Sequence, residues 1–172
     1  MLKAKGYVQT SYMKEKLNCI LLVDDDEPTN FLSTLLIEEA NCTQHLEITE
    51  SGKKALDYLC KLKEENGGAG YFHPDLIFLD INMPCMNGWE FLEKYQGIKN
   101  RSYPRPIIIM LTTSLDPDDK QKALNIVDVA GFEHKPLTRE MLERVIKKYC
   151  TPENKLRKDA PAIMNTTQRE FK

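Results

Sequence analysis

The 172 residues suffice for one folded domain with terminal segments, and a hydrophobic content of 41% can supply one core. The formal net charge of −2 comes from interspersed acidic and basic residues, which gives no electrostatic case for binding nucleic acid or an anionic membrane. Five scattered cysteines without a CxxC pair favour neither a disulfide framework nor a thiolate zinc site. No apolar run is long enough to span a bilayer, so we expect a cytoplasmic protein.

The two ends of the chain differ from its middle. Residues 1–17 and 151–172 are polar and lack a sustained hydrophobic period. We therefore interpret them as an N-terminal extension and a C-terminal tail that flank a domain of residues 18–150.

The domain begins with a buried strand and a helix. Residues 19–23 form a continuous apolar run with β-branched members, which is typical of a parallel strand covered on both faces. Pro28 is compatible with the first turn of a helix. That helix is predicted to extend to about residue 40, because apolar residues recur at helical spacing, namely Phe31, Leu32, Leu35, Leu36 and Ile37.

A second strand and helix follow. Residues 45–49 indicate a short strand, and Ser51 is a candidate cap for a helix that carries Ala55, Leu56, Leu59 and Leu62. The glycines in residues 66–74 predict a loop. Residues 76–79 are then a third apolar strand, which Asp80 closes.

The remaining elements repeat this alternation. Asn87-Gly88 turns the chain into a helix with Trp89, Phe91, Leu92 and Tyr95, and residues 107–111 form a fourth apolar strand. Asp116 is predicted to cap a helix that carries Ala123, Leu124 and Val127. Residues 129–133 form a brief fifth strand, and Thr138 caps a last helix with Met141, Leu142, Val145 and Ile146. Strands that alternate with helices five times predict an α/β fold with a doubly wound parallel sheet.

Acidic residues stand where two of the apolar strands end. Asp24, Asp25 and Asp26 follow the first strand, and Asp80 follows the third. The triple acid alone is equally compatible with a solvated turn before a helix, where negative charge is favourable. Asp80 favours a binding site, because ligands of open α/β sheets bind at the carboxyl ends of the strands.

Convergent carboxylates of this kind suit a magnesium ion. Like charges oppose each other's ionisation unless a cation lies among them, and Mg²⁺ prefers oxygen ligands. An aspartate beside the ion can act as a nucleophile that accepts a phosphoryl group. Thr112 and Lys135, each after its own apolar strand, would bind the phosphoryl oxygens.

Four segments together carry a resemblance to a known family. The stretches VDDDEP, DLIFLDINMPCMNGWEF, PIIIMLTTS and AGFEHKP make residues 19–149 similar to the receiver domain of two-component response regulators. The resemblance implies a flavodoxin-like (CheY-like) sheet of order 2-1-3-4-5.

The resemblance also implies roles for individual residues. Asp80 resembles the phosphoacceptor, and Asp24 and Asp25 resemble the acidic pair that binds Mg²⁺ with Asp80 and the backbone carbonyl of Asn82. Thr112 is similar to the switch hydroxyl, Lys135 to the lysine that pairs with the phosphate, and Phe132 to the aromatic residue that turns inward on activation. Phe132 stands where the family often has Tyr, so a phenolic hydrogen bond is absent. Asp26 has no family role, and we interpret it as a charge at a helix start.

The implied partners are a sensor histidine kinase or a histidine phosphotransfer protein, and downstream another protein or a second copy of this chain. The glycine-containing loop is similar to that of stand-alone regulators associated with bacterial phytochromes. Three alternatives stay open: a receiver-like interaction module that works without phosphate, a Mg²⁺-dependent phosphatase and a flavodoxin-like electron carrier. The phosphatase would carry a second Asp where this chain has Asn82, and VDDDEP would repel a flavin phosphate.

Overall fold

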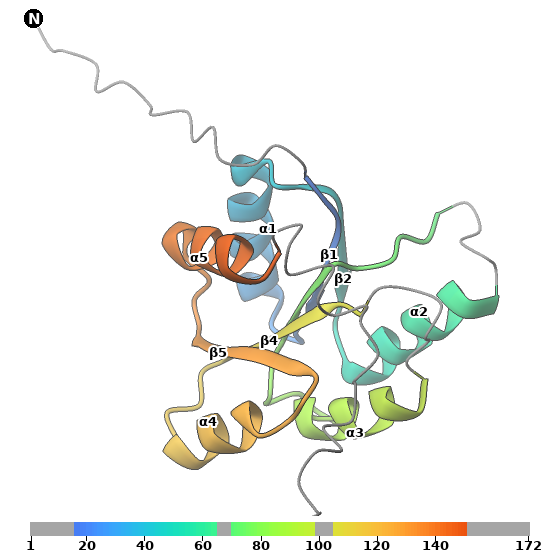
Figure 1. Ribbon diagram of the computed structural model, residues 1–172, viewed down its shortest axis with the longest axis vertical. Helices are drawn as coiled ribbons and strands as arrows, with labels where there is room; N and C mark the ends of the chain where they lie inside the picture. The colour runs from blue at the N-terminus through green and yellow to red at the C-terminus, as the bar shows by residue number, and fades with distance from the viewer. Residues whose placement is uncertain (1–15, 65–69, 99–104, 151–172) are drawn as a thin grey trace, which may run out of the picture.

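The computed structural model describes residues 16–64, 70–98 and 105–150 (Figure 1). Most of the predicted N-terminal extension, the whole predicted tail and the first glycines of the 66–74 loop lie outside these residues. In the described ranges, no helix combines the length and the apolar character that a bilayer crossing requires.

Five strands and five helices alternate along the described chain. The strands are β1 (Leu17–Val23), β2 (Thr43–Thr49), β3 (Leu76–Leu79), β4 (Ile107–Thr112) and β5 (Val129–His134). The helices are α1 (Glu27–Ala40), α2 (Gly52–Glu64), α3 (Gly88–Ile98), α4 (Pro117–Leu124) and α5 (Arg139–Tyr149). The strands pair in parallel in the order β2-β1-β3-β4-β5, which confirms the doubly wound, flavodoxin-like sheet.

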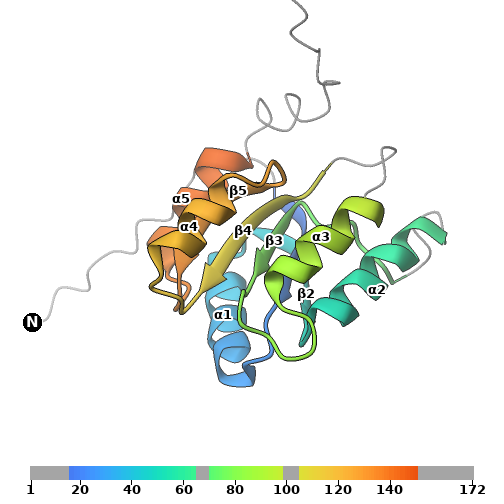
Figure 2. The same cartoon turned by 90° about the horizontal axis from the view of Figure 1, so that it is seen from below.

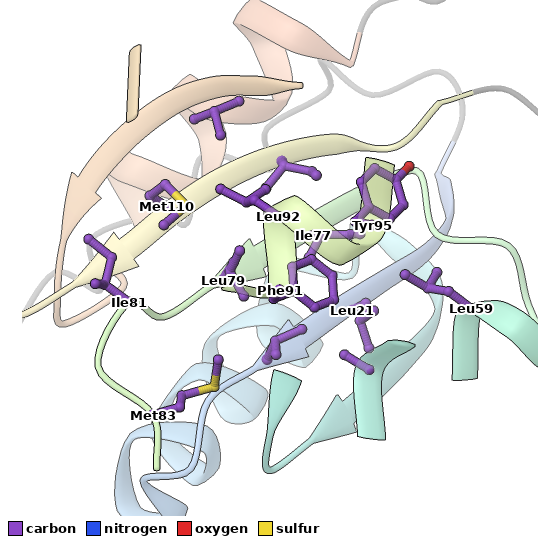
Figure 3. Close-up of a cluster of buried hydrophobic side chains, with 14 of the residues drawn as sticks. Leu21, Leu59, Ile77, Leu79, Ile81, Met83, Phe91, Leu92, Tyr95 and Met110 are labelled. Carbon is purple, nitrogen blue, oxygen red and sulfur yellow. The ribbon is translucent and has the colours of Figure 1, made fainter. Parts of the chain in front are cut away.

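Helices cover both faces of the sheet. Helices α1 and α5 lie on one face, and α2, α3 and α4 lie on the other (Figures 1 and 2). Because successive side chains of a strand point to opposite faces, Leu21 and Val23 of β1 join one apolar cluster while Ile20 and Leu22 join the other. Figure 3 shows the first cluster, where Phe91 and Leu92 of α3 pack over the strands. Both faces of the central strands are therefore buried, as their continuous apolar runs predicted.

The three predicted helix caps, Ser51, Asp116 and Thr138, are confirmed, and Asp26 caps helix α1. The side chains of the four capping residues each accept a hydrogen bond from a backbone N–H two or three residues later; they are Asp26, Ser51, Asp116 and Thr138. These bonds satisfy N–H groups that have no partner inside the helix. Asp26 is thus a helix-start residue, as the sequence indicated.

The prediction that Val127 belongs to the fourth helix was wrong. Helix α4 ends at Leu124, and the backbone N–H of Ile126 then donates to the carbonyl of Ala123 in a tight turn. Another such bond, from Val129 to Ile126, leads directly into β5. Val127 lies on this turn, and its side chain is 91% exposed.

Helix α1 has an unusual distribution of polar and apolar side chains. Its predicted extent is confirmed, but Phe31 and Leu32 are 61% and 60% exposed. The buried positions are Asn30, Ser33 and Ile37. The first half of the helix therefore buries two small polar side chains and exposes apolar ones, whereas Ile37 in its second half packs in the core as in an ordinary surface helix.

Candidate functional site

The pairing of β1 with β3 brings two of the predicted acidic residues together. Val23 and Leu79, the last residues of these strands, are register partners, and the N–H of Asp80 donates to the carbonyl of Val23 at 2.9 Å. Asp24 and Asp80 therefore leave the same edge of the sheet from adjacent strands. Both are buried, with 6% and 5% of their surface exposed.

Lys135 joins this pair from the other side of β4. Its backbone N–H donates to the carbonyl of Thr112 at 2.9 Å, which fixes the start of the segment after β5, and the Lys135–Pro136 bond is cis. The Lys135 Nζ lies 2.6 Å from Asp24 Oδ2 and 2.7 Å from Asp80 Oδ2. The ammonium thus bridges the two carboxylates in a position where only 8% of its side chain is exposed.

The charges of this site depend on one another. Burial alone would lower the pKa of Lys135, but its hydrogen bonds to Asp24 and Asp80 outweigh burial, so the pKa is raised and the ammonium form is stabilised. Burial raises the pKa of Asp24, while Lys135 opposes that rise. The second oxygen of Asp80 accepts a hydrogen bond from the N–H of Ile81 at 2.7 Å. These contacts hold the Asp80 carboxylate in one orientation.

The acidic residues meet the requirements of a divalent cation. One carboxylate oxygen from each of Asp24, Asp25 and Asp80 lies within 4.8 Å of the others. With Lys135 included and all groups ionised, the site has two more negative than positive charges. An all-oxygen donor set with that charge fits Mg²⁺ better than zinc, which takes His and Cys ligands.

The other predicted residues lie on the loop after β3 and on strands β4 and β5. Asn82 is exposed on the loop after β3. Thr112 is fully buried at the end of β4, where its hydroxyl accepts a hydrogen bond from the N–H of Ser114. Phe132 is buried on β5 in the same apolar cluster as Met110, with its ring edge-on to that of His134. The structure brings together Asp24, Asp25, Asp80 and Lys135, and it places Thr112 and Phe132 on the two neighbouring strands.

Three residues that sequence reasoning missed also shape the site. Asn30 and Ser33 of α1 line a small pocket with Asp24 and Asp80. Gly88 begins α3 directly against the backbone of Asp80. The polar pair three residues apart among apolar neighbours was a signal for the first two, whereas nothing before or after Gly88 indicates its close contact.

Comparisons with known proteins identify the family of this chain. The family model described as the response regulator receiver domain matches residues 20–147. The probable methanogenesis regulatory protein FilR2 of Methanothrix harundinacea is 35% identical over 129 residues, which cover 74% of this chain and 78% of that protein.

Solved structures give the same result. A two-component response regulator from Cytophaga hutchinsonii is 33% identical with a TM-score of 0.67, over 78% of this chain and 97% of the other. The bacteriophytochrome response regulator AtBRR is 25% identical with a TM-score of 0.61, over 77% and 92% of the two chains. The chain therefore belongs to the response regulator receiver domain family of two-component signalling, with the CheY-like fold of that family.

Proposed function

We propose that the protein is a phosphoacceptor response regulator that carries a phosphoryl group on Asp80. The observation that carries the proposal is the buried Lys135 ammonium, which contacts the buried carboxylates of Asp24 and Asp80 beside the exposed carboxylate of Asp25. A structural role alone would need only one acid to pair with one lysine. The additional acids suit a cation, and the Asp80 carboxylate then serves as nucleophile.

The proposed reaction is transfer from a phosphohistidine. An oxygen of Asp80 attacks phosphorus, the P–N bond breaks with its electron pair going to the imidazole, and a P–O bond forms. Bound Mg²⁺, held by Asp24, Asp25, Asp80 and the carbonyl of Asn82, would neutralise charge on the phosphoryl oxygens. Lys135 would pair with one of those oxygens, and water would later hydrolyse the acyl phosphate. The protein thus promotes its own phosphorylation and dephosphorylation and does not turn over a free substrate.

The signal would arise from local pairing. A phosphoryl group adds close to two negative charges, which attract the Lys135 ammonium and the Thr112 hydroxyl. The Thr112 hydroxyl would leave its hydrogen bond with the N–H of Ser114 to reach the phosphoryl group. Phe132 on β5 would turn inward in response. Reversal of a 1:99 population needs about 5.5 kcal/mol, and several charge-assisted hydrogen bonds of about 1.5–3 kcal/mol each can supply it.

The phosphodonor would be a sensor histidine kinase or a histidine phosphotransfer protein. Helix α1 starts beside the acidic pocket, and its outer face exposes Phe31, Leu32 and Leu35. Exposed apolar side chains at the entrance to a reactive pocket are a suitable contact for such a protein. Phe31→Ser should slow transfer from the protein donor and leave labelling by a small donor unchanged.

The partner that recognises the phosphorylated form would be another protein or a second copy of this chain. Helix α4, strand β5 and helix α5 would form the responding surface, since they adjoin Thr112 and Lys135. We propose a domain of residues 18–150 between terminal extensions, and a cytoplasmic location.

Intact mass measurement tests the function. Incubation with acetyl phosphate and Mg²⁺ should add one phosphoryl group to the wild-type chain and none to Asp80→Asn. An equally labelled Asp80→Asn variant would overturn the assignment. Absence of any adduct would favour the phosphate-independent module, and turnover of free phosphate esters would favour the phosphatase.

A further inference from the structure

We infer that Asn30 is a positioning residue for the proposed Mg²⁺ site, acting through the peptide that joins Asp24 to Asp25. The inference rests on the proposed function and adds a residue to it. The amide Nδ2 of Asn30 donates to the backbone carbonyl of Asp24 at 2.8 Å, and Asn30 is only 6% exposed.

The position of that carbonyl gives the bond its importance. β1 ends at Val23, so the Asp24 carbonyl is the first one past the strand and belongs to the peptide between the two predicted metal ligands. Rotation of this peptide would change the directions of both carboxylates. The bond from Asn30 holds the peptide in the orientation in which the oxygens of Asp24, Asp25 and Asp80 converge.

One further bond connects Asn30 to the same turn, and another lies within the turn. The backbone N–H of Asn30 donates to the carbonyl of Asp26 at 3.0 Å, and the N–H of Asp26 donates to Asp24 Oδ1 at 3.1 Å. The first turn of α1 is thus tied to both the backbone and the side chain of the acidic segment. Asn30 fits this task because a neutral amide donates without adding another charge to the pocket.

The burial of polar side chains in the first half of helix α1 supports this role. A surface helix that buries only apolar side chains gains more from the hydrophobic effect than one that buries an amide. Asn30 nevertheless occupies a buried position one residue before an exposed phenylalanine, Phe31. The hydrogen bond from the Asn30 amide to the Asp24 carbonyl explains why an amide is buried at this position.

Calorimetric titration of MgCl₂ into the unphosphorylated full chain tests the inference. Asn30→Leu keeps the volume and removes the donor, and we expect magnesium affinity to fall by about 10-fold to 100-fold, the range typical of residues that orient metal ligands. Asn30→Gln keeps an amide donor and should recover part of the loss. Labelling by acetyl phosphate should need more Mg²⁺ in Asn30→Leu but reach the same maximal rate.

Ile37→Val is the matched control, because Ile37 is buried on the same helix away from the acidic turn. It should lower the urea midpoint of unfolding and leave magnesium affinity within about twofold. A folded Asn30→Leu variant with wild-type affinity would overturn the inference. If Asn30→Leu does not fold, Asn30→Ser, whose side chain is too short to reach the carbonyl, is judged by the same criterion. Failure of the wild-type chain to bind Mg²⁺ would instead defeat the proposed function.

Discussion

Gly88, the first residue of α3, packs so closely on Asp80 that a β-carbon at position 88 would lie 2.4 Å from the Asp80 carbonyl oxygen. The N–H of Gly88 also donates to the carbonyl of Ile81 at 2.9 Å. Helix α3 therefore begins against the backbone that presents the proposed phosphoacceptor. Only glycine permits this distance, since the atom it approaches belongs to the backbone and cannot rotate away.

Gly88→Ala is expected to displace Asp80. The added methyl group forces the helix start and the β3 end apart, and overpacking of this kind costs about 1–3 kcal/mol. Urea unfolding should show a loss of stability in that range, and labelling by acetyl phosphate should be slower.

Gly97→Ala serves as the control in the same helix. A β-carbon at Gly97 has no neighbour within 4 Å, so the change should raise stability by about 0.5–1 kcal/mol through helix propensity. Equal changes in stability and in labelling rate for Gly88→Ala and Gly97→Ala would contradict the steric role of Gly88.

Lys135→Met is expected to destabilise the protein when Mg²⁺ is chelated. Removal of the ammonium leaves the buried carboxylates of Asp24 and Asp80 without their partner, and breaking a buried ion pair in this way costs about 3–5 kcal/mol. Mg²⁺ should restore part of the loss, because it binds the carboxylates of the folded state. Thermal or urea unfolding with EDTA and with Mg²⁺ measures both effects.

Lys53→Met provides the comparison. Lys53 lies 3.0 Å from Asp57, but both side chains are more than half exposed. Exposed ion pairs contribute about 0–1 kcal/mol, and this variant should not respond to Mg²⁺. A Lys135→Met protein as stable in EDTA as the wild type would show that the ammonium does not stabilise the pocket.

His73 is expected to make stability depend on pH in the weakly acidic range. Burial lowers the pKa of His73 below its ordinary value of 6.5. Between the two pKa values the unfolded state binds a proton that the folded state does not bind. The contribution of neutral His73 to the free energy of unfolding is therefore complete above about pH 6.5 and is lost as pH falls through the lower pKa of the folded state. His73→Gln should flatten this part of the urea stability profile between pH 7.5 and 5. Parallel profiles for the wild type and His73→Gln would contradict the expected effect of His73 on stability.

The five cysteines are expected to react with thiol reagents at very different rates. Cys85 is exposed on the loop after Asp80, whereas burial raises the pKa of Cys19 to about 12 and also raises that of Cys42. A disulfide reagent such as DTNB should modify Cys85 first in the native protein. Cys85→Ser should remove this fast phase, and a fast phase that survives the substitution would disprove the exposure argument.

Much of the site was predictable because strand ends are visible in the sequence. Asp24 and Asp80 each directly follow a continuous apolar run, Lys135 follows the brief fifth strand, and the carboxyl ends of parallel strands share one edge of the sheet. The order of the strands was not derivable from periodicity, because alternating elements are compatible with several orders. The family motifs supplied it.

The remaining features depend on contacts between distant segments. Gly88 looked like an ordinary turn glycine until its distance from Asp80 was known. Asn30 was not among the predicted site residues, because the helix was predicted from the apolar period that includes Phe31 and Leu32, both of which are exposed. Ala130, which the irregular register leaves between Val129 and Gly131 opposite Ile108 and Ile109, has no signature in the sequence.

Reduction by borohydride after acetyl phosphate treatment is the most direct measurement of the central claim. Hydride cleaves an aspartyl phosphate at its acyl carbon and converts the residue to homoserine, which peptide mass spectrometry can locate. The account predicts homoserine at position 80. Its yield should depend on Mg²⁺ and should be lower in Asn30→Leu than in the wild type at limiting Mg²⁺. Homoserine at another acidic residue, or none under conditions where Mg²⁺ binding is demonstrated, would contradict it.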